Sequence, residues 1–523
     1  MTTTLKSYVS GKWQAGSGQG AALVNPSTGE TLAHASTEGV DFAAAVRFAR
    51  EKGGPALRAL TFAGRAALLK SLAQVVNDAR EELIALGVAN AGNTRGDAKF
   101  DIDGAAATLN FYADLGAKLG EVQVLPDGEG IPLGRSARLY GQHVLVPRTG
   151  VAVHINAFNF PAWGMGEKLA VALLAGMPVI TKPATSTALM AFRLAELWVE
   201  KAGLPEGAFS FIAGSAGNLL SQLGGQDVLA FTGSSDTALT LRKTEAVLAA
   251  NTHVNVEADS LNSAILGTDV QAGSETLNLF LTDVVKEMTQ KTGQKCTATR
   301  RIYVPAAQLD EVKGLLIDRL SAVRPGNPAD EKTTMGPLAT ATQLKDIRAG
   351  IDRLAKSYEL ALGGSAPVAG LDKGYFVAPT LLVNKSPKAD ATDPVNGHEV
   401  FGPVATLIPY SDTAFLIAHV AAGGGGLVSS IFSDDKAFTA AVLSGIAPWH
   451  GRVTISSEKV AGQTIPPGTV MPSLLHGGPG RAGGGEELGG TRGMGLYLQR
   501  VAIQGPRPFV ESFAGLKPAA PAA

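Results

Sequence analysis

The chain contains one cysteine in 523 residues, Cys296. A single thiol excludes both an intramolecular disulfide and a metal cage built from several thiolates. Its neighbours, residues 293–297, are small or polar, which suits an accessible nucleophile, although a free cysteine is more often an inert buried hydrophobe. The sequence therefore offers one thiol for covalent chemistry, and other segments have to decide between these two interpretations.

An excess of charge and a long apolar run are also missing. The chain has 45 basic and 46 acidic residues, so it lacks the field that gathers nucleic acid or an anionic membrane. The longest strongly apolar stretch, residues 169–180, is shorter than the ~20 residues that a membrane span needs. No basic segment followed by an apolar run opens the sequence. We expect a cytoplasmic protein that acts on a small molecule, with no nucleic acid or membrane partner.

Two nucleotide motifs and the usual metal motifs are absent. The sequence has no Gly-x-Gly-x-x-Gly after its first central strand and no Gly-x4-Gly-Lys-Ser/Thr anywhere. Its eight histidines form no His-x3-His or Cys/His set, so no metal is expected. We interpret four of them as structural: His154, His253, His398 and His476.

From residue 151 onward, short apolar strands alternate with helical segments. This rhythm predicts a doubly wound parallel sheet of the α/β class. The expected strands are 151–155, 178–181, 209–212, 228–231 and 252–256, and the expected helices are 164–176, 187–202, 217–224 and 234–249.

The flanking regions have their own patterns. Short strands are expected over 8–36, helices over 40–53 and about 60–90, and a second lobe from about 257 with a helix at 274–292. Alternation predicts strands at 301–304, 351–362, 137–149 and 496–511, the last two as a dimerisation flap. The glycine-rich stretch 477–493 reads as an ordered turn rather than a phosphate cradle, since no strand is expected directly before it.

Polar residues follow the ends of the central strands. Asn159 follows the first, Lys182 the second, Ser234 the fourth and Glu257 the fifth. Ligands of such sheets bind outside the carboxyl ends of the strands, and a helix starting at Ser234 would favour a pyrophosphate. Taken singly, Asn159 is more often a turn former, Lys182 a solvated flank and Ser234 an ordinary helix cap.

Taken together and in this order, the motifs closely resemble those of the aldehyde dehydrogenase superfamily over nearly the whole chain. The matching text is Asn159-Phe-Pro161, Lys182-Pro-Ala, Phe231-Thr-Gly-Ser234, Glu257, Gly293-Gln-Lys-Cys296 and Glu399-Val-Phe401-Gly-Pro403.

The resemblance implies an NAD(P)-dependent oxidation of an aldehyde. The fold implied is a Rossmann-type cofactor domain, an α/β catalytic domain and a small β oligomerisation domain. Cys296 would be the nucleophile, Asn159 part of the oxyanion hole and Glu257 the general base. The implied cofactor contacts are Lys182, Thr185, Ser234, Phe158, Glu399 and Phe401.

Two departures from the family pattern carry information. The usual Glu-Leu-Gly-Gly-Lys is replaced by Glu257-Ala-Asp259-Ser-Leu-Asn262, so the loop that carries Glu257 loses its glycines and gains a carboxylate. Thr185 stands where members that prefer NAD commonly have glutamate, so a 2′-phosphate would not be repelled and NADP is expected, with NAD as the weaker cofactor.

These departures resemble a narrower group, which includes the dehydrogenase half of the ring-opening enzyme of phenylacetate degradation. The resemblance implies a CoA-linked semialdehyde as substrate, oxidised to the carboxylate in aerobic benzoate degradation. Candidate phosphate contacts are Arg300, Arg301, Arg481 and Arg492. The alternatives are a general medium-chain dehydrogenase, a CoA-acylating one, or a silent binding protein.

The family resemblance also implies a homodimer and a division into domains. The cofactor domain would comprise 1–136 and 150–256, the catalytic domain 257–495, and the oligomerisation segments 137–149 and 496–523.

Overall fold

The first lobe is built on a nine-stranded sheet, in a computed structural model that describes residues 3–516. Five central strands run parallel and are buried on both faces, which explains their almost continuous apolar sequences. The sheet order is β12 (His253–Glu257), β11 (Val228–Thr232), β8 (Ala152–Ile155), β9 (Val179–Lys182), β10 (Phe209–Phe211), β1 (Thr3–Val9), β4 (Thr31–Ala35) and β3 (Ala21–Val24), with β2 (Lys12–Ala15) paired to β1.

The order of these parallel strands reverses between β8 and β11, which are neighbours in the sheet but not in the chain. At such a switch point the following loops diverge and leave a crevice beyond the carboxyl ends of the strands. The loops that carry Asn159 and Ser234 both begin at this point.

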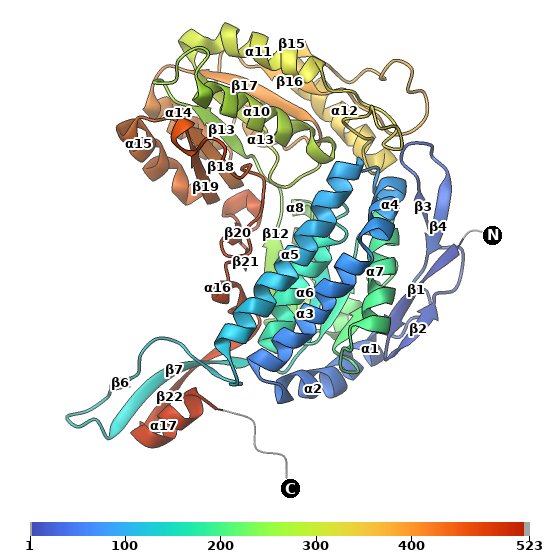
Figure 1. Cartoon of the computed structure of the whole chain (residues 1–523), viewed down its shortest axis with the longest axis vertical. Coiled ribbons are helices and arrows are strands. Elements are labelled where there is room, and N and C mark those ends of the chain that lie inside the picture. The colour runs from blue at the N-terminus through green and yellow to red at the C-terminus, as the bar shows by residue number, and fades with distance from the viewer. Residues whose placement is uncertain (1–2, 517–523) are drawn as a thin grey trace.

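Helices cover both faces of this sheet (Figure 1). One face is covered by α2 (Gly54–Ala59), α3 (Phe62–Asp78), α4 (Arg80–Ala91), α5 (Arg95–Leu119), α6 (Trp163–Ala175) and α7 (Ala188–Lys201). The other is covered by α1 (Phe42–Phe48), α8 (Ser235–Arg242) and α9 (Glu245–Ala249). Asp101 of α5 accepts hydrogen bonds from the backbone N–H groups of Ala162 and Trp163, and so fixes the start of α6 beside the switch point.

The second lobe has a seven-stranded sheet that is parallel except for its edge strand β15. Its order is β15 (Glu359–Leu362), β16 (Thr380–Val383), β17 (Val404–Tyr410), β14 (Arg301–Pro305), β13 (Ser263–Leu266), β18 (Gly426–Phe432) and β19 (His450–Ser456). Helices α10 (Glu275–Thr289) and α11 (Leu309–Ser321) pack on one face. The other face carries α12 (Ala341–Ala355), α13 (Pro394–Gly397), α14 (Thr413–Ala422) and α15 (Lys436–Ile446).

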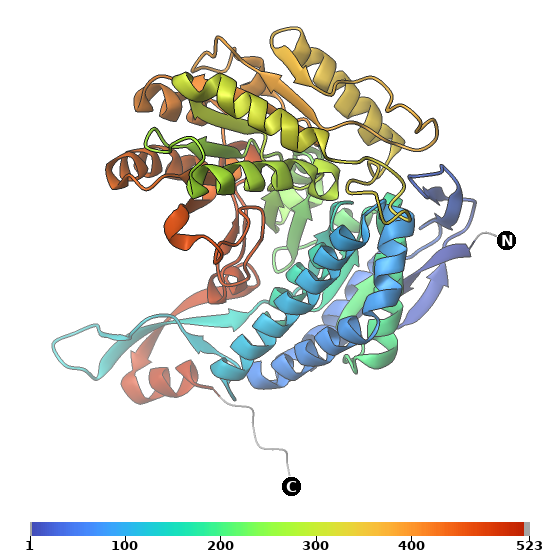
Figure 2. The same ribbon diagram turned by 45° about the horizontal axis from the view of Figure 1, so that its top comes forward.

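An arm projects from the two lobes (Figures 1 and 2). Its long strands, β7 (Leu139–Pro147) and β22 (Leu498–Pro506), pair antiparallel along their whole length, and β5 (Leu125–Pro126) and β6 (Ile131–Pro132) pair with β7. The two strands predicted at 137–149 and 496–511 are therefore confirmed. Residues 507–511 are an exception, because they begin α17 (Arg507–Ala514), and residues 517–523 lie outside the described part.

Three predictions about local structure are wrong. Residues 351–355 end α12, and only 359–362 form a strand, because the apolar positions of this segment pack at helical spacing. The helix predicted over 217–224 is a single 3-10 turn at Leu219–Gln222. The glycine-rich stretch does follow a strand: β20 (Leu475–Gly477) pairs with β21 (Glu486–Leu488), and α16 (Thr491–Met494) comes next.

In residues 3–516, no single helix has the length and apolar composition to cross a membrane. One bent pair of helical segments, Phe42–Ala59 and Phe62–Asp78, passes that test together, with an angle of 111° between its members.

Candidate active site

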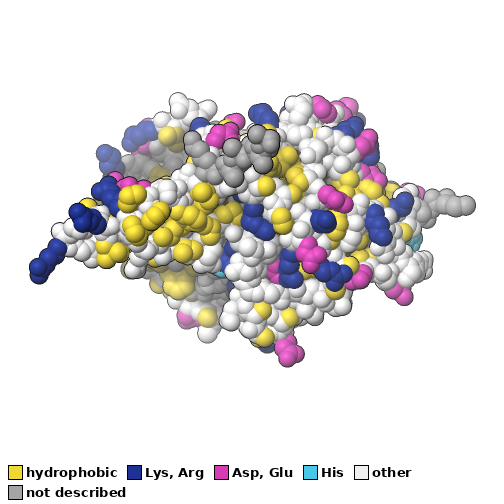
Figure 3. Space-filling model, turned by 90° about the horizontal axis from the view of Figure 1, so that it is seen from below, with side chains coloured by type: hydrophobic (Ala, Val, Ile, Leu, Met, Phe, Trp, Pro, Cys, Tyr) yellow, Lys and Arg dark blue, Asp and Glu magenta, His cyan; other side chains and the backbone are white. Residues whose placement is uncertain are grey.

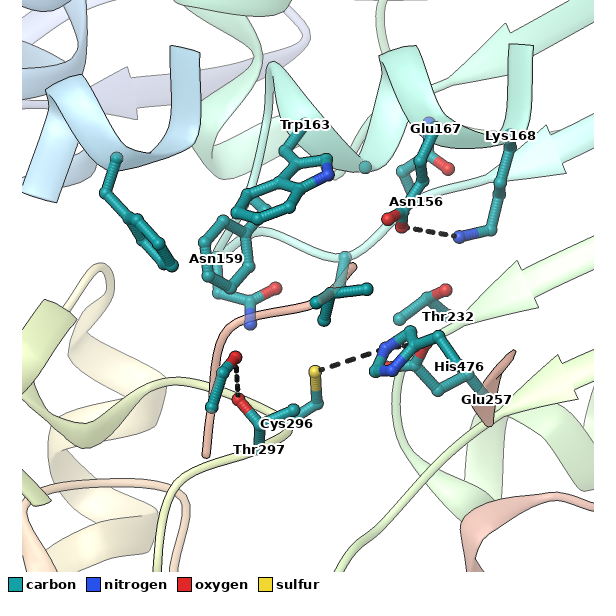
Figure 4. A pocket seen from close by; sticks show the side chains of 16 residues that line it. Asn156, Asn159, Trp163, Glu167, Lys168, Thr232, Glu257, Cys296, Thr297 and His476 are labelled. Atoms are coloured by element: carbon teal, nitrogen blue, oxygen red, sulfur yellow. Dashed lines mark hydrogen bonds and ion pairs between the residues drawn. The ribbon is translucent and has the colours of Figure 1, made fainter. Parts of the chain in front are cut away.

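Two cavities meet at Cys296. The thiol pocket, drawn in Figure 4, is lined by Phe100, Asn156, Ala157, Asn159, Phe160, Trp163, Gly164, Glu167, Lys168, Thr232, Glu257, Cys296, Thr297, Gly468, Val470 and His476. The long groove, of about 750 Å³, runs from the same thiol between the two lobes. The residues that border both cavities are Asn156, Ala157, Asn159, Thr232, Glu257 and Cys296. The thiol is thus accessible from both sides, which favours the reactive interpretation of the lone cysteine.

The backbone before Cys296 is held in an unusual shape. Lys291 and Thr292 are left-handed, with φ of 52° and 56°, and Gly293 continues the turn at φ 66°. A Cβ on Gly293 would lie 2.3 Å from the backbone of Gly402, so only glycine fits there. Asn262 donates a hydrogen bond of 2.7 Å to the carbonyl of Cys296. These contacts fix the nucleophile loop against the second lobe.

Glu257 ends β12 and points into the thiol pocket (Figure 4). The non-standard loop after it is held by other segments: Ala258 N–H donates to the carbonyl of Ala482, and Ser260 N–H donates to the carboxylate of Glu399. Loss of the family's glycines therefore leaves the Glu257 carboxylate in the pocket, 2% exposed.

His476 also lines this pocket, although the sequence interpretation gives it no place in the site. Its Nε2 lies 2.9 Å from Oε2 of Glu257 and 3.9 Å from Sγ of Cys296, and the three side-chain atoms lie within 4.8 Å of one another. The interpretation of His476 as structural rests on the absence of a His-x3-His or Cys/His set, and no sequence motif joins it to Glu257 and Cys296. The three come from β12, the nucleophile loop and β20, so only the fold brings them together.

Charge within this trio shifts each pKa. Burial alone would raise the pKa of Glu257, but the charge of His476 and the hydrogen bond from it hold that pKa at about 2. Burial would lower the pKa of His476, yet Glu257 raises it above its ordinary value. Burial, and then the nearby Glu257, raise the pKa of the Cys296 thiol well above its usual range. In the resting site, Glu257 is therefore ionised and the thiol keeps its proton.

A buried ion-pair network lies behind the trio. Lys168 Nζ contacts Glu487 Oε2 at 3.0 Å and Glu167 Oε1 at 3.4 Å. Burial raises the pKa of Glu167 to about 7, against the opposing charge of Lys168. Nothing in the sequence predicts this network, since Glu487 lies some three hundred residues from Glu167 and Lys168.

The wall of the thiol pocket opposite the trio is apolar and aromatic. Phe100, Phe160 and Trp163 pack edge to face, with ring centroids 5.2–6.0 Å apart. Asn159 stands between this wall and Cys296 (Figure 4). The pocket thus pairs a surface for a hydrocarbon chain with an amide donor beside the thiol.

Most of the expected cofactor residues border the long groove. Lys182, Ser234, Phe158, Glu399 and Phe401 all line it. The rings of Phe158 and Phe401 stand edge to face at 5.9 Å. Ser234 caps α8, and its hydroxyl accepts from Thr237 N–H. Glu399 accepts a hydrogen bond of 3.1 Å from Arg300 Nε. Burial lowers the pKa of Lys182 to about 8.

Two details differ from the expectations for this groove. Thr185 borders a neighbouring hollow rather than the long groove, although Ala184 beside it lines the groove. Asp259, the carboxylate gained in the non-standard loop, accepts a hydrogen bond from Ser235 N–H at 3.1 Å. It therefore occupies part of the helix N-terminus that was expected to receive a pyrophosphate.

Two of the proposed phosphate contacts are wrong. Arg301 is fully buried and donates to the carbonyls of Leu261, His419 and Val420. Arg300 is 4% exposed and pairs with Glu399. Both guanidinium groups hold the second lobe together and cannot reach a ligand's phosphate.

A family model described as the aldehyde dehydrogenase family matches residues 13–499. The chain belongs to the aldehyde dehydrogenase family. This aldehyde dehydrogenase is 45% identical over 479 residues to the 3,4-dehydroadipyl-CoA semialdehyde dehydrogenase of Aromatoleum evansii, which covers 91% of this chain and 93% of that protein. The predicted family and enzyme class are confirmed.

Solved structures agree with the fold. The NAD+ complex of an aldehyde dehydrogenase from Bacillus cereus is 25% identical, has a TM-score of 0.83 and covers 96% of each chain. A mutant of aldehyde dehydrogenase C from Pseudomonas syringae, complexed with NAD+ and octanal, is 26% identical with a TM-score of 0.82, and covers 100% of this chain and 98% of that one. The α/β fold class predicted for this aldehyde dehydrogenase is confirmed.

Proposed function

We propose that this aldehyde dehydrogenase oxidises a CoA-linked semialdehyde, 3,4-dehydroadipyl-CoA semialdehyde, to its carboxylate with NADP, as a step of aerobic benzoate degradation. The observation that carries the proposal is the 45% identity over 91% of the chain to an enzyme of that name. The aromatic wall of the thiol pocket is consistent with an unsaturated hydrocarbon chain next to the aldehyde.

In the first half-reaction, Cys296 is the nucleophile in our proposal. Its thiolate adds to the aldehyde carbon and forms a thiohemiacetal, whose alkoxide is stabilised by the Asn159 amide and by the backbone N–H of Cys296. Removing one such donor costs on the order of 3 kcal/mol of transition-state stabilisation. Asn159 is 8% exposed and borders both cavities, which suits a donor to an oxygen on Cys296.

In the second half-reaction, Glu257 is the general base. The thioester left on Cys296 is hydrolysed by a water that gives its proton to the Glu257 carboxylate. Oε1 of Glu257 is buried and has no hydrogen-bond partner in residues 3–516, so it is free to accept from this water. A base at this place favours hydrolysis over the CoA-acylating alternative, in which a thiol takes the acyl group.

The donor set of the long groove fits a nicotinamide dinucleotide. NADP, when bound, supplies the acceptor for the hydride of the aldehyde carbon. Phe158 and Phe401 would flank the nicotinamide, Glu399 would hold its ribose, Ser234 the pyrophosphate and Lys182 the adenosine ribose. The groove volume of about 750 Å³ lies in the usual range for small-molecule sites.

The preference for NADP depends on Thr185 and Lys182. A hydroxyl and an ammonium can bind a 2′-phosphate, whereas a carboxylate at position 185 would repel it. We expect wild type to show the higher kcat/KM with NADP, and T185E to move the ratio toward NAD by at least about tenfold. A ratio that stays unchanged in T185E would contradict this role. The matched control is S186E, next to Thr185 on the same short turn, only partly buried and outside the long groove.

The role of the CoA group of the substrate is tested by removing it. We compare kcat/KM for the semialdehyde as its CoA thioester and as the free acid, with product identified by mass. If the CoA group contributes binding energy, the thioester should be the better substrate. Equal values would leave a general medium-chain aldehyde dehydrogenase, and an acyl-CoA product at the aldehyde end would indicate the acylating alternative.

We further propose a homodimer and the domain roles stated above, with the arm as its oligomerisation element. β22 is an edge strand whose residues are mostly exposed, and apolar side chains gather on this arm (Figure 3). Val501 is 39% and Phe509 74% exposed, beside a hollow of about 460 Å³. A second copy of the chain would cover this surface. V501R/F509E should yield monomers by light scattering, whereas the control L248E, at an exposed leucine of α9, should not.

A further inference from the structure

His476 stands at the one place where it can act on both proposed reacting groups. Its ring enters the thiol pocket from β20 and lies beside Glu257 and Cys296 (Figure 4). Its Nε2 is 2.9 Å from the carboxylate and 3.9 Å from the sulfur. The inference below rests on Cys296 being the reacting thiol.

The distances decide which way the ring donates. An oxygen at 2.9 Å requires a hydrogen on Nε2, since an ionised carboxylate can only accept. That nitrogen therefore cannot also take the thiol's proton, and a Cys–His arrangement with the imidazole as base is excluded. When the ring is charged, its second proton resides on Nδ1. Gain or loss of that proton changes the ring's charge but leaves the Nε2–H bond to Glu257 in place.

Among residues 3–516, the acceptor that faces the thiol is the Glu257 carboxylate, which lies within 4.8 Å of the sulfur. The S–H bond breaks, an O–H bond forms on Glu257, and the electron pair stays on sulfur. The negative charge thereby moves from Oε2 of Glu257, which is 2.9 Å from Nε2 of His476, to Sγ of Cys296, which is 3.9 Å from it. A positively charged imidazolium opposes this transfer, because it attracts the negative charge more strongly at the shorter distance. At an effective dielectric of ~20, the equilibrium constant for the proton transfer is roughly tenfold lower with a charged ring than with a neutral one.

We propose that His476 is a positioning residue that holds Glu257 against the thiol through Nε2–H, and that the thiol becomes reactive only when the ring has lost its Nδ1 proton. The ring holds Oε2 of Glu257 at 2.9 Å and leaves Oε1, which has no hydrogen-bond partner in residues 3–516, free to accept a proton.

Other charges around the ring set where it titrates. Glu257 and Glu167 favour the charged imidazolium, and Arg452 disfavours it. The ionisable groups facing the ring from the elements packed against it are Glu257 of β12, Cys296, Glu167 and Lys168 of α6, Glu487 of β21 and Arg452 of β19. Glu257 and Glu167 outweigh the burial of the ring and raise the pKa of His476 above its ordinary value, so the ring loses its charge at a higher pH than an exposed histidine does.

The single cysteine allows a direct test without aldehyde or cofactor. Any alkylation by iodoacetamide reports Cys296, so its rate is measured from pH 6 to 9 on the full chain. Wild type should show a rise of roughly tenfold at the His476 transition, above the ordinary slope of a titrating thiol. H476Q keeps an N–H donor without a titrating ring, so it should lose this step and exceed wild type at pH 6. H476L lacks the donor and should be slower than H476Q at every pH.

H253Q is the matched control, because His253 is an exposed histidine at the other end of β12, and it should keep the wild-type profile. Thermal unfolding checks that each variant is folded. A wild-type step that persists in H476Q would overturn the titration role, and equal rates in H476L and H476Q would overturn the positioning role. Neither outcome depends on which aldehyde is the substrate.

Discussion

The thiol pocket and the long groove share a border at Cys296, yet they are built in different ways. Polar groups of the pocket are held by one another across distant segments, as in the contacts of Glu257 with His476 and of Lys168 with Glu487. In the groove, Glu399 is likewise tied to Arg300, but Lys182 and Ser234 bond within their own segments: Lys182 Nζ donates to the carbonyl of Pro183, and Ser234 accepts from Thr237 N–H. Substitutions in the pocket should therefore be coupled, whereas those of Lys182 and Ser234 should be small and additive.

The largest effect is expected at the centre of the pocket. C296A removes the proposed nucleophile and should lower kcat by at least about a thousandfold. E257Q should instead slow the second half-reaction, so that an acyl-enzyme accumulates and is seen by intact-protein mass. Full turnover by E257Q would contradict its assignment as base. The double variant C296A/E257Q should be no slower than C296A alone, because without the thiol there is no acyl-enzyme for Glu257 to hydrolyse.

The next effect is expected at Asn159, the donor beside the thiol. N159A should lower kcat/KM by roughly a hundredfold to a thousandfold, since an oxyanion loses one hydrogen bond. Its apparent KM for NADP should change little, because the neighbouring groove is otherwise intact. A loss confined to cofactor affinity would show that Asn159 belongs to the groove rather than to the oxyanion site.

The same contrast explains what the sequence could predict. The central strands and the residues at their ends carry local signals, and the structure brings Asn159, Glu257 and Cys296 to one place as expected. His476 and the Lys168–Glu487 pair carry no such signal, because their partners are distant in the chain and the partners alone give them a role. The prediction that Arg300 and Arg301 contact a phosphate is wrong for the same reason, since only tertiary packing shows that both are buried.

A smaller effect is expected where the non-standard loop meets the groove. Asp259 accepts from Ser235 N–H at the start of α8, so a bound pyrophosphate would face its negative charge. D259N keeps a side chain that can cap the helix and removes the charge. Its KM for NADP should fall roughly twofold to fivefold, and less so at high salt. E245Q, at the start of α9, controls for a general change in charge.

The smallest effect concerns pH at Lys182, which should act alone. Burial lowers the pKa of this lysine to about 8, so it is mostly charged at pH 7 and mostly neutral at pH 9. An ammonium that pairs with the 2′-phosphate loses that attraction as pH rises through about 8, and the KM for NADP should rise roughly twofold. K182R stays charged throughout this range and should show a flat profile. With NAD, which lacks the phosphate, wild type should change less. A rise of equal size in K182R would assign the titration to another group, and the groove would then share the coupling that distinguishes the pocket.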